Sequence, residues 1–374
     1  MPFTEFDRSM MQRALALARL GMGQVSPNPM VGCVITNANG EILGEGAHLA
    51  FGGAHAEPNA IRDAESNGHS VRGATVYVTL EPHCHEGKTA PCTKLLIEKR
   101  IARCVIAMED PNPNVNGKGI RELRDAGIQV EAGLLEAEAR ELNRFFIKHV
   151  TTGLPYVTLK LAMTLDGKSA LLSGKSKWIT SEASRSVVHA MRAEHDAVLI
   201  GARTALLDDP ELTVRLASGR QPRRIVLDAR LDLPSRLKLF TDAHRAQTIL
   251  ITTPAAPESK RNLFSAQGIE IMVIEGSGER IDLVQMLRQF GQRNIVSILV
   301  EAGPTLAASI IEEGLFDELV LFYGPMIFGA DARPSVGPLE LTAITNARRL
   351  SLKSMERLEG LDDVVIRLTQ VKRP

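Results

Sequence analysis

The sequence predicts an α/β protein built from two domains, residues 1–150 and 151–374. The chain has 374 residues, more than one typical domain contains. In both halves, short apolar runs with the spacing of strands alternate with amphipathic helical patterns. A turn-forming segment at residues 151–155 interrupts this alternation, and a second series of strands follows it. We therefore expect the domain boundary at this segment.

The first half predicts helices and strands in regular alternation. A helix is expected over residues 3–20, with Met10, Ala14, Leu17 and Ala18 on its apolar face and glycines after it. The elements expected next are strand 31–35, a return strand from residue 42, helix 55–66, strand 74–80, helix 91–100, strand 104–108, a helix from residue 118, strand 128–132 and helix 135–148. This order favours a mostly parallel sheet that is covered on both faces.

The second half has strands of its own. They are expected at residues 156–162, 197–200, 224–227, 248–252, 271–274, 298–301 and 319–323. After the strand at 298–301 come Gly303 and a helix that runs to Glu313, and a strand, a glycine turn and a helix start can bind an anion. An ordinary turn between a strand and a helix has the same pattern. No Gly-x-Gly-x-x-Gly is present, so a Rossmann dinucleotide fold is not supported.

The composition excludes several classes of function. The formal net charge is zero and aromatic residues make up 4% of the chain, whereas a nucleic-acid-binding protein needs a basic surface and stacking aromatics. Four cysteines in a chain of this length are not a disulfide framework. The N-terminus does not read as a signal peptide, and no apolar run reaches membrane-spanning length. We expect a cytoplasmic protein with no nucleic-acid or membrane partner.

Possible metal ligands gather in two short segments. The first is His55-Ala56-Glu57, at the expected start of a helix, and the second spans residues 81–92, with His83, Cys84 and Cys92. A His-x-Glu followed later by a Pro-Cys is typical of zinc-dependent deaminases. There, one His and two further ligands hold zinc and leave a position for water. The Glu is not a ligand, because it carries protons from the water to the ring nitrogen and the leaving amine.

A closed structural zinc site is the alternative, because the cluster offers more than four possible ligands. Glu57 argues against it, since a structural site has no use for a carboxylate next to a ligand. The paired Cys-x2-Cys spacing of a zinc ribbon is also missing. We therefore expect a catalytic zinc near two helix starts, whose partial positive charge favours thiolate over thiol.

Several short segments spread over nearly the whole chain share their order with one known family. They are residues 28–32, 55–57, 81–92, 109–113, 164–168, 178–181, 208–210 and 301–305. In these segments the chain resembles the RibD family, the bifunctional deaminase/reductases of riboflavin biosynthesis. Each segment alone is weak, but their number and order make the resemblance specific.

The resemblance implies a cytidine-deaminase-like α/β/α domain followed by a dihydrofolate-reductase-like α/β domain. The first domain would use one Zn²⁺ to remove an amine from a diamino-hydroxy-pyrimidine that carries a phosphoribosylamino group. The second would use NADPH to reduce the ribose of the deaminated product to ribityl. We expect a small-molecule substrate of this kind and a homo-oligomer, either a dimer or a tetramer.

The resemblance also implies site residues. Asn28 would contact the pyrimidine. The other substrate contacts would be Ser176, Arg192, Leu212, Arg215 and Glu301. The NADPH contacts would be Ala162, Trp178, Thr204, Asp208, Ala229, Gly303, Pro304, Thr305, Leu306, Ala307, Ala308 and Ser309. Two arginines suit a phosphorylated sugar, because a guanidinium binds phosphate with two hydrogen bonds.

The chain departs from the family at the third metal ligand. The family reads Glu-Pro-Cys-x-His where this chain has Glu81-Pro82-His83-Cys84-His85. The ligands would be His55, Cys92 and either His83 or Cys84, since both side chains are compatible with tetrahedral zinc. His83 stands at the position of the ligand in the family motif, which favours His83. The preference of zinc for a thiolate ligand favours Cys84. An imidazole in place of a thiolate would leave the site more positive.

Two other functions compete with this interpretation. A nucleic-acid base deaminase would need the basic surface and the aromatic residues that the composition does not provide. A zinc-stabilised nucleotide-binding regulator without turnover would not need Glu57. Ammonia release from the pyrimidine substrate, and its loss on chelation, would distinguish an enzyme from a binding protein.

Overall fold

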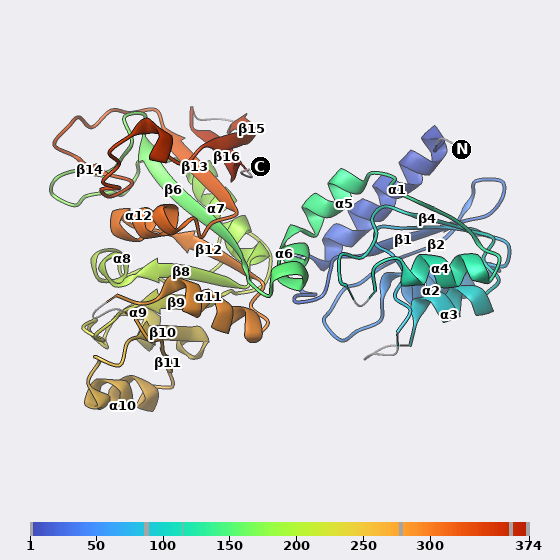
Figure 1. The fold of residues 1–374 in the computed structure, drawn as a ribbon, viewed down its shortest axis with the longest axis horizontal. Coiled ribbons are helices and arrows are strands. Elements are labelled where there is room, and N and C mark those ends of the chain that lie inside the picture. The colour runs from blue at the N-terminus through green and yellow to red at the C-terminus, as the bar shows by residue number, and fades with distance from the viewer. Residues whose placement is uncertain (1–2, 86–89, 114, 277–279, 359–361, 372–374) are drawn as a thin grey trace. The chain divides into compact units, whose positions relative to one another are not determined.

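The computed structural model describes residues 3–85, 90–113, 115–276, 280–358 and 362–371. The chain forms two compact units, Met1–Gly153 and Leu154–Pro374 (Figure 1). The segment at residues 151–155 lies at this division, although its first two residues still belong to a helix, α6 (Arg144–Thr152). Within the described ranges, every helix is too short or too polar to cross a bilayer.

The first unit is a five-stranded mixed sheet with helices on both faces (Figure 1). The strand order is β2-β1-β3-β4-β5, antiparallel from β2 to β3 and parallel from β3 to β5. The elements before α6 are α1 (Glu5–Ala18), η1 (Arg19–Gly21), β1 (Gly32–Thr36), β2 (Ile42–Ala47), α2 (Ala56–Ser66), β3 (Thr75–Val78), α3 (Cys92–Glu98), β4 (Arg103–Ile106), α4 (Lys118–Asp125), β5 (Gln129–Ala132) and α5 (Glu136–Leu142).

Successive side chains along each strand of this sheet point to opposite faces, so neighbouring residues pack against different helices. Val34, Tyr77 and Val105 pack with α1 and α5, whereas Cys33 and Val76 pack with α2, α3 and α4. All five side chains are buried. Because α2 and α3 cover the same face, their N-termini can approach each other.

Three expectations for the first half need correction. The sheet is not mostly parallel, since β1 pairs antiparallel with both of its neighbours. Leu17 is only half buried, and Leu15 lies in the core in its place. The helix expected over residues 135–148 breaks at Asn143, whose side chain accepts from the Met30 N–H (2.8 Å) and donates to the Met30 carbonyl (3.0 Å). These two bonds tie the break to the segment before β1.

The second unit contains a nine-stranded sheet in the order β11-β10-β9-β8-β12-β6-β13-β16-β15. Pairing is parallel from β11 to β13 and antiparallel in the last three strands. A two-stranded sheet pairs β14 with β7. The elements are β6 (Tyr156–Thr164), β7 (Lys168–Ala170), α7 (Glu182–Glu194), β8 (Ala197–Gly201), α8 (Ala202–Asp208), β9 (Arg223–Leu227), α9 (Lys238–Thr241), η2 (Arg245–Gln247), β10 (Thr248–Thr252), α10 (Glu258–Ala266), β11 (Glu270–Val273), α11 (Leu283–Gln292), β12 (Ser297–Glu301), α12 (Pro304–Glu313), β13 (Glu318–Gly324), β14 (Arg333–Pro334), η3 (Ile344–Asn346), β15 (Leu350–Arg357) and β16 (Val364–Gln370).

Helices cover both faces of the large sheet. α11 and α12 pack on one face and α7, α9 and α10 on the other. The central strands are parallel, so their carboxyl ends lie at one edge of the sheet. After β8 the chain continues to β9, and after β12 it continues to β13 on the opposite side. In an open α/β sheet, ligands bind at the carboxyl edge where the chain departs in opposite directions.

The sequence interpretation missed the C-terminal hairpin of β15 and β16. β15 alternates poorly, because a bulge interrupts its pairing with β16 between Leu352 and Ser354. The strand is also largely exposed, so it lacks the apolar run of a buried strand. The hairpin extends the sheet beyond β13 and brings the C-terminal segment against α7.

Candidate active sites

Three of the expected metal ligands lie together in the first unit. The ligand atoms of His55, His83 and Cys92 all lie within 4.8 Å of one another. The ring centroids of His55 and His83 are 4.5 Å apart. His55 directly precedes α2, and Cys92 is the first residue of α3. Two helix N-termini therefore converge on this cluster.

The cluster has the dimensions of a zinc site. Zinc lies about 2.3 Å from a thiolate sulfur and about 2.0 Å from an imidazole nitrogen, so at a tetrahedral angle the two atoms are about 3.5 Å apart. Cys92 Sγ and His55 Nδ1 are separated by 3.6 Å. Burial and the neighbouring His83 lower the pKa of His55 to about 4, so its ring is neutral near physiological pH. A neutral imidazole is the form that binds metal.

Glu57 borders the cluster from the first turn of α2. Its side chain is 3% exposed. Burial raises the pKa of Glu57. This effect outweighs that of a hydrogen bond with Cys92, which lowers the pKa. A carboxyl group with a raised pKa exchanges protons more readily near neutral pH, as a general acid and base must.

The loop that carries His83 contains the alternative ligand. Cys84 is described by the structure but does not belong to the group formed by His55, His83 and Cys92. The ring of His85 lies 5.5 Å from that of His83. Residues 86–89, the middle of the expected motif, lie outside the described residues.

A buried carboxylate anchors this loop. Glu81 accepts hydrogen bonds from four backbone N–H groups, those of Asp110, Gly117, Gly119 and Ile120, at 2.9–3.2 Å. Its charge lies at the N-terminus of α4, where the helix dipole favours an anion. A Cβ on Gly119 would lie 2.1 Å from the Pro82 carbonyl oxygen, so only glycine permits this approach. The sequence suggested no role for Glu81, since its partners lie 29–39 residues away.

The expected pyrimidine contact, Asn28, has a partner that the sequence did not reveal. Its side-chain amide donates to His48 Nε2 at 3.1 Å. His48 Nδ1 lies 3.0 Å from the Ala54 carbonyl oxygen, to which it can donate, and this leaves Nε2 as the acceptor for the Asn28 amide. The ring centroid of His48 lies 5.3 Å from that of His55. Asn28 is therefore joined to the cluster through His48, which has no motif spacing in the sequence.

In the second unit, the expected cofactor residues gather at the carboxyl edge of the large sheet. Thr204 and Asp208 lie on α8, directly after β8, and Ala229 lies two residues after β9. Ala162 lies near the end of β6. The segment from Gly303 to Ser309 forms the start of α12, directly after β12.

The start of α12 fits a phosphate group. Gly303 precedes the helix and Pro304 occupies its first position, as at many helix N-termini. A Cβ on Gly303 would lie 3.0 Å from Thr204 Oγ1, so the glycine lets the Thr204 side chain approach the start of the helix closely. A helix N-terminus suits the pyrophosphate of a dinucleotide.

Two of the expected substrate residues form a buried ion pair. Arg192 Nε and Nη2 donate to the two oxygens of Glu301 at 2.6 and 3.0 Å, and Arg192 Nη1 donates to the Thr213 carbonyl at 3.0 Å. Burial alone would raise the pKa of Glu301, but the charges of Arg192 and Lys160 outweigh it and lower the pKa to about 2. Glu301 is therefore an anion at all ordinary pH values.

Lys160 is a further candidate that the sequence interpretation missed. Burial lowers its pKa, and its charge interacts with those of Glu301, Arg192 and Asp208. A lysine inside the apolar strand β6 is a visible signal, because charged residues rarely occupy a central strand. Its position beside Glu301 and Asp208 joins an expected substrate contact to an expected cofactor contact.

The loop after α8 carries Leu212 and Arg215. Leu212 is 2% exposed and has a left-handed backbone, φ +53°. The Arg215 backbone N–H donates to His189 Nδ1 on α7 at 3.0 Å. The Arg215 guanidinium is half exposed and pairs with Glu211 at 2.6 Å. His189 thus fixes the backbone of Arg215 while the charged group stays accessible.

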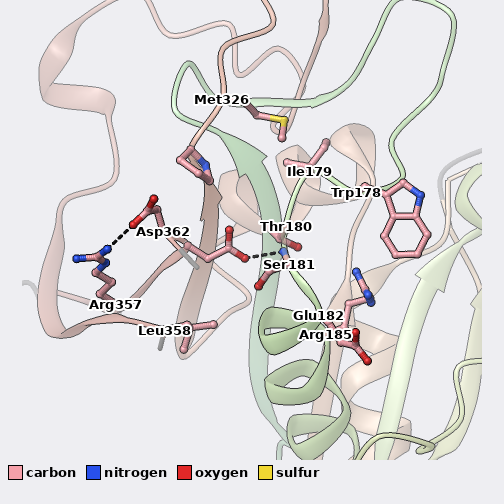
Figure 2. Close-up of a pocket in the computed structure, with 12 residues that line it drawn as sticks. Trp178, Ile179, Thr180, Ser181, Glu182, Arg185, Met326, Arg357, Leu358 and Asp362 are labelled. Carbon is pink, nitrogen blue, oxygen red and sulfur yellow. Dashed lines mark hydrogen bonds and ion pairs between the residues drawn. The ribbon is translucent and has the colours of Figure 1, made fainter. Parts of the chain in front are cut away.

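Trp178 lies on the turn before α7 that follows Ser176, next to Ile179, whose carbonyl approaches Gly324 at the carboxyl end of β13. Its indole is 71% exposed, and the Arg185 guanidinium lies 4.5 Å from the ring centroid. A pocket of about 880 Å³ adjoins this turn (Figure 2). Among the expected cofactor contacts that the structure describes, the lining of this pocket includes only Trp178.

Comparison with known proteins gives both units a counterpart. Residues 4–108 match the family model described as the cytidine and deoxycytidylate deaminase zinc-binding region, and residues 155–361 match the RibD C-terminal domain. The riboflavin biosynthesis protein RibD of Aquifex aeolicus is 41% identical over 97% of this chain and 98% of its own.

Solved structures are similar over the same extent. Acinetobacter baumannii RibD (form 1) is 36% identical, with a TM-score of 0.87 over 98% of this chain and 99% of that chain. The diaminohydroxyphosphoribosylaminopyrimidine deaminase/5-amino-6-(5-phosphoribosylamino)uracil reductase of Thermotoga maritima is also 36% identical, with a TM-score of 0.84 and the same coverage.

Proposed function

Because the chain belongs to the RibD family of bifunctional deaminase/reductases in riboflavin biosynthesis, we propose that it carries out both reactions at two separate sites. The substrate is a small phosphoribosyl pyrimidine. Its amine is removed first, and the ribose of the resulting uracil is then reduced with NADPH. The observation that carries this proposal is the zinc-sized cluster of His55, His83 and Cys92 with the buried Glu57 beside it.

At the deaminase site, His55, His83 and Cys92 would hold zinc, with His55 binding through Nδ1. Zinc, when bound, supplies a Lewis acid that activates water near neutral pH. Glu57 would take a proton from the attacking water and pass it to the ring nitrogen, and then protonate the leaving amine. Ammonia and a ring carbonyl result. The raised pKa of Glu57, which burial causes, supports this role.

Asn28 would hold the pyrimidine ring. The hydrogen bond from its amide to His48 fixes the side-chain orientation, so the amide oxygen is the group left to face a ligand. An amide oxygen accepts from a ring N–H or an exocyclic amine, both of which a diaminopyrimidine offers. This supports Asn28 as the residue that orients the ring.

At the reductase site, NADPH supplies the hydride. Ala162, Thr204, Asp208 and Ala229 would contact it at the carboxyl edge of the sheet. Its pyrophosphate would lie at the start of α12, contacted by Gly303, Pro304, Thr305, Leu306, Ala307, Ala308 and Ser309. Trp178 would contact the cofactor from the turn before α7.

The substrate contacts proposed here are Ser176, Arg192, Leu212, Arg215 and Glu301. Arg192 already uses three of the five guanidinium N–H groups, two with Glu301 and one with Thr213. Arg215 is half exposed, so it is the better placed of the two arginines to bind the phosphate. Arg192 would mainly hold Glu301 as a fixed anion that accepts hydrogen bonds from the sugar.

The assembly and compartment are also proposals. We propose a homo-oligomer, a dimer or a tetramer. β15 ends the strand order of the large sheet and exposes Leu352 and Met355 by 62% and 66%, as surfaces that associate often do. We propose a cytoplasmic location, which suits an enzyme whose four cysteines form no disulfide.

The two activities are expected to be separable at the division between the units. A fragment from Leu154 to the C-terminus keeps the complete large sheet, so it should fold and reduce the deaminated substrate without zinc. NADPH consumption by the purified fragment, with chelator present, is the measurement. A fragment that folds and binds NADPH but reduces nothing would overturn the proposed division of labour.

A further inference from the structure

One distant carboxylate, that of Asp363, holds the turn that carries Trp178. The Ser181 N–H and the Ser184 hydroxyl each donate to Asp363 Oδ2 at 2.6 Å, and Figure 2 marks the bond at Ser181. Asp363 is 3% exposed and lies one residue before β16. It therefore joins the C-terminal hairpin to the start of α7, across 182 residues of chain.

The turn needs such support because its backbone is strained. Trp178 has φ +76°, in the left-handed region that bulky residues avoid. The next residue, Ile179, is 6% exposed, and a Cβ on Gly324 would lie 1.8 Å from its carbonyl oxygen. The turn is thus held on one side by its close approach to Gly324 and on the other by Asp363.

The same carboxylate also holds the N-terminus of α7, the helix that carries Arg185. α7 has 13 residues, and an anion at its N-terminus is favourable for the helix dipole. Arg185, in the first turns of α7, stacks on the Trp178 ring, as Figure 2 shows. Losing Asp363 would loosen the indole and the guanidinium together. Arg192, in the last turn of α7, is held separately by Glu301.

We propose that Asp363 is a positioning residue for NADPH, which acts by holding Trp178 and Arg185 in place before the cofactor binds. The proposal rests on the proposed function, in which Trp178 contacts NADPH. Asp363 itself would not touch the cofactor. Arg192 and Glu301 hold each other in place without Asp363. Loss of Asp363 should therefore weaken the binding of NADPH and leave the binding of the pyrimidine unchanged.

The test uses the full chain and its only tryptophan. Trp178 is the single Trp in the sequence, so NADPH titrations followed by tryptophan fluorescence report on this turn directly. In Asp363→Ala we expect the Kd and the KM for NADPH to rise about tenfold, the scale of losing hydrogen bonds to a charged group. The kcat at saturating NADPH and the KM for the deaminated substrate should stay within about twofold, since the second site is intact.

Asp362→Ala is the matched control. It removes the neighbouring carboxylate, which lines the same pocket as Asp363 but is exposed. Among the contacts described, Asp362 pairs only with the exposed Arg357. We expect NADPH binding to be unchanged in this variant. Asp363→Asn keeps one acceptor oxygen and should give an intermediate Kd. Gly324→Ala pushes on the Ile179 carbonyl and should weaken NADPH binding as Asp363→Ala does.

Several results would overturn the proposal. One is an unchanged Kd for NADPH in a folded Asp363→Ala protein, and another is an equal rise in Asp362→Ala. A lower kcat with an unaltered KM for NADPH would indicate a merely structural role. If Asp363→Ala does not fold, unchanged Kd values in both Asp363→Asn and Gly324→Ala would be decisive against it. A wild-type fluorescence that does not respond to bound NADPH would instead contradict the proposed contact at Trp178, which is a separate failure.

Discussion

Glu57→Gln is expected to abolish deamination while zinc stays bound. The amide keeps the size of the side chain but cannot accept and return a proton, so ammonia release should fall by at least the ~10²–10⁴-fold typical of a lost general acid and base. Glu57 borders the cluster of His55, His83 and Cys92 and is not part of it, so the metal content should not change. Ammonia release and zinc content are measured on the same sample.

The reductase serves as the internal control for this variant. Glu57 lies in the first unit, so reduction of the deaminated substrate by Glu57→Gln should match that of the wild type. Near-normal ammonia release from a zinc-replete Glu57→Gln protein would remove Glu57 from the mechanism. A parallel loss of zinc would point to a role for Glu57 in metal binding instead.

Loss of the third ligand is expected to remove zinc from the protein. In His83→Ala only His55 and Cys92 would remain, whereas catalytic zinc usually has three protein ligands. The fall in zinc affinity should exceed the ~10–100-fold drop that follows loss of a hydrogen-bond partner of a ligand. Deamination should fall with it. Competition against a metal indicator gives the affinity, and elemental analysis gives the zinc content.

Two variants control for the identity of this ligand. Cys84→Ala should keep its zinc, because Cys84 does not belong to the cluster. His83→Cys restores the residue that the family resemblance led us to expect, and it should also bind zinc. A zinc-free Cys84→Ala beside a zinc-loaded His83→Ala would reverse the assignment. Equal losses in both would favour a closed site that uses both side chains.

Much of the fold follows from local pattern. The strand at residues 248–252 has the bounds expected from the sequence, and α12 ends at Glu313 as expected, because each is a buried apolar run or a periodic stripe with a clear end. β15 was missed because its bulge breaks the alternation on which strand prediction depends. The antiparallel pairing of β1 with β3 depends on strand order, which no local pattern specifies.

The residues of the candidate sites also differ in how far the sequence alone could predict them. His55, Glu57 and Cys92 belong to short motifs at helix starts, so the sequence alone suggested them, and their roles stay predictions. Glu81 and Asp363 act through partners 29 or more residues away, so only the folded chain reveals their contacts. The roles expected from the resemblance for residues such as Ser176 and Ala229 remain predictions.

The most direct test of the account follows NADPH consumption by the full chain with two substrates, before and after chelation. With zinc present, both the diaminopyrimidine and the deaminated uracil should support NADPH oxidation, the first only after ammonia is released. After chelation, the uracil should still be reduced at the original rate and the diaminopyrimidine should not, until zinc is returned. Equal loss of NADPH oxidation on both substrates would contradict two separate sites, and so would full oxidation on the diaminopyrimidine without zinc.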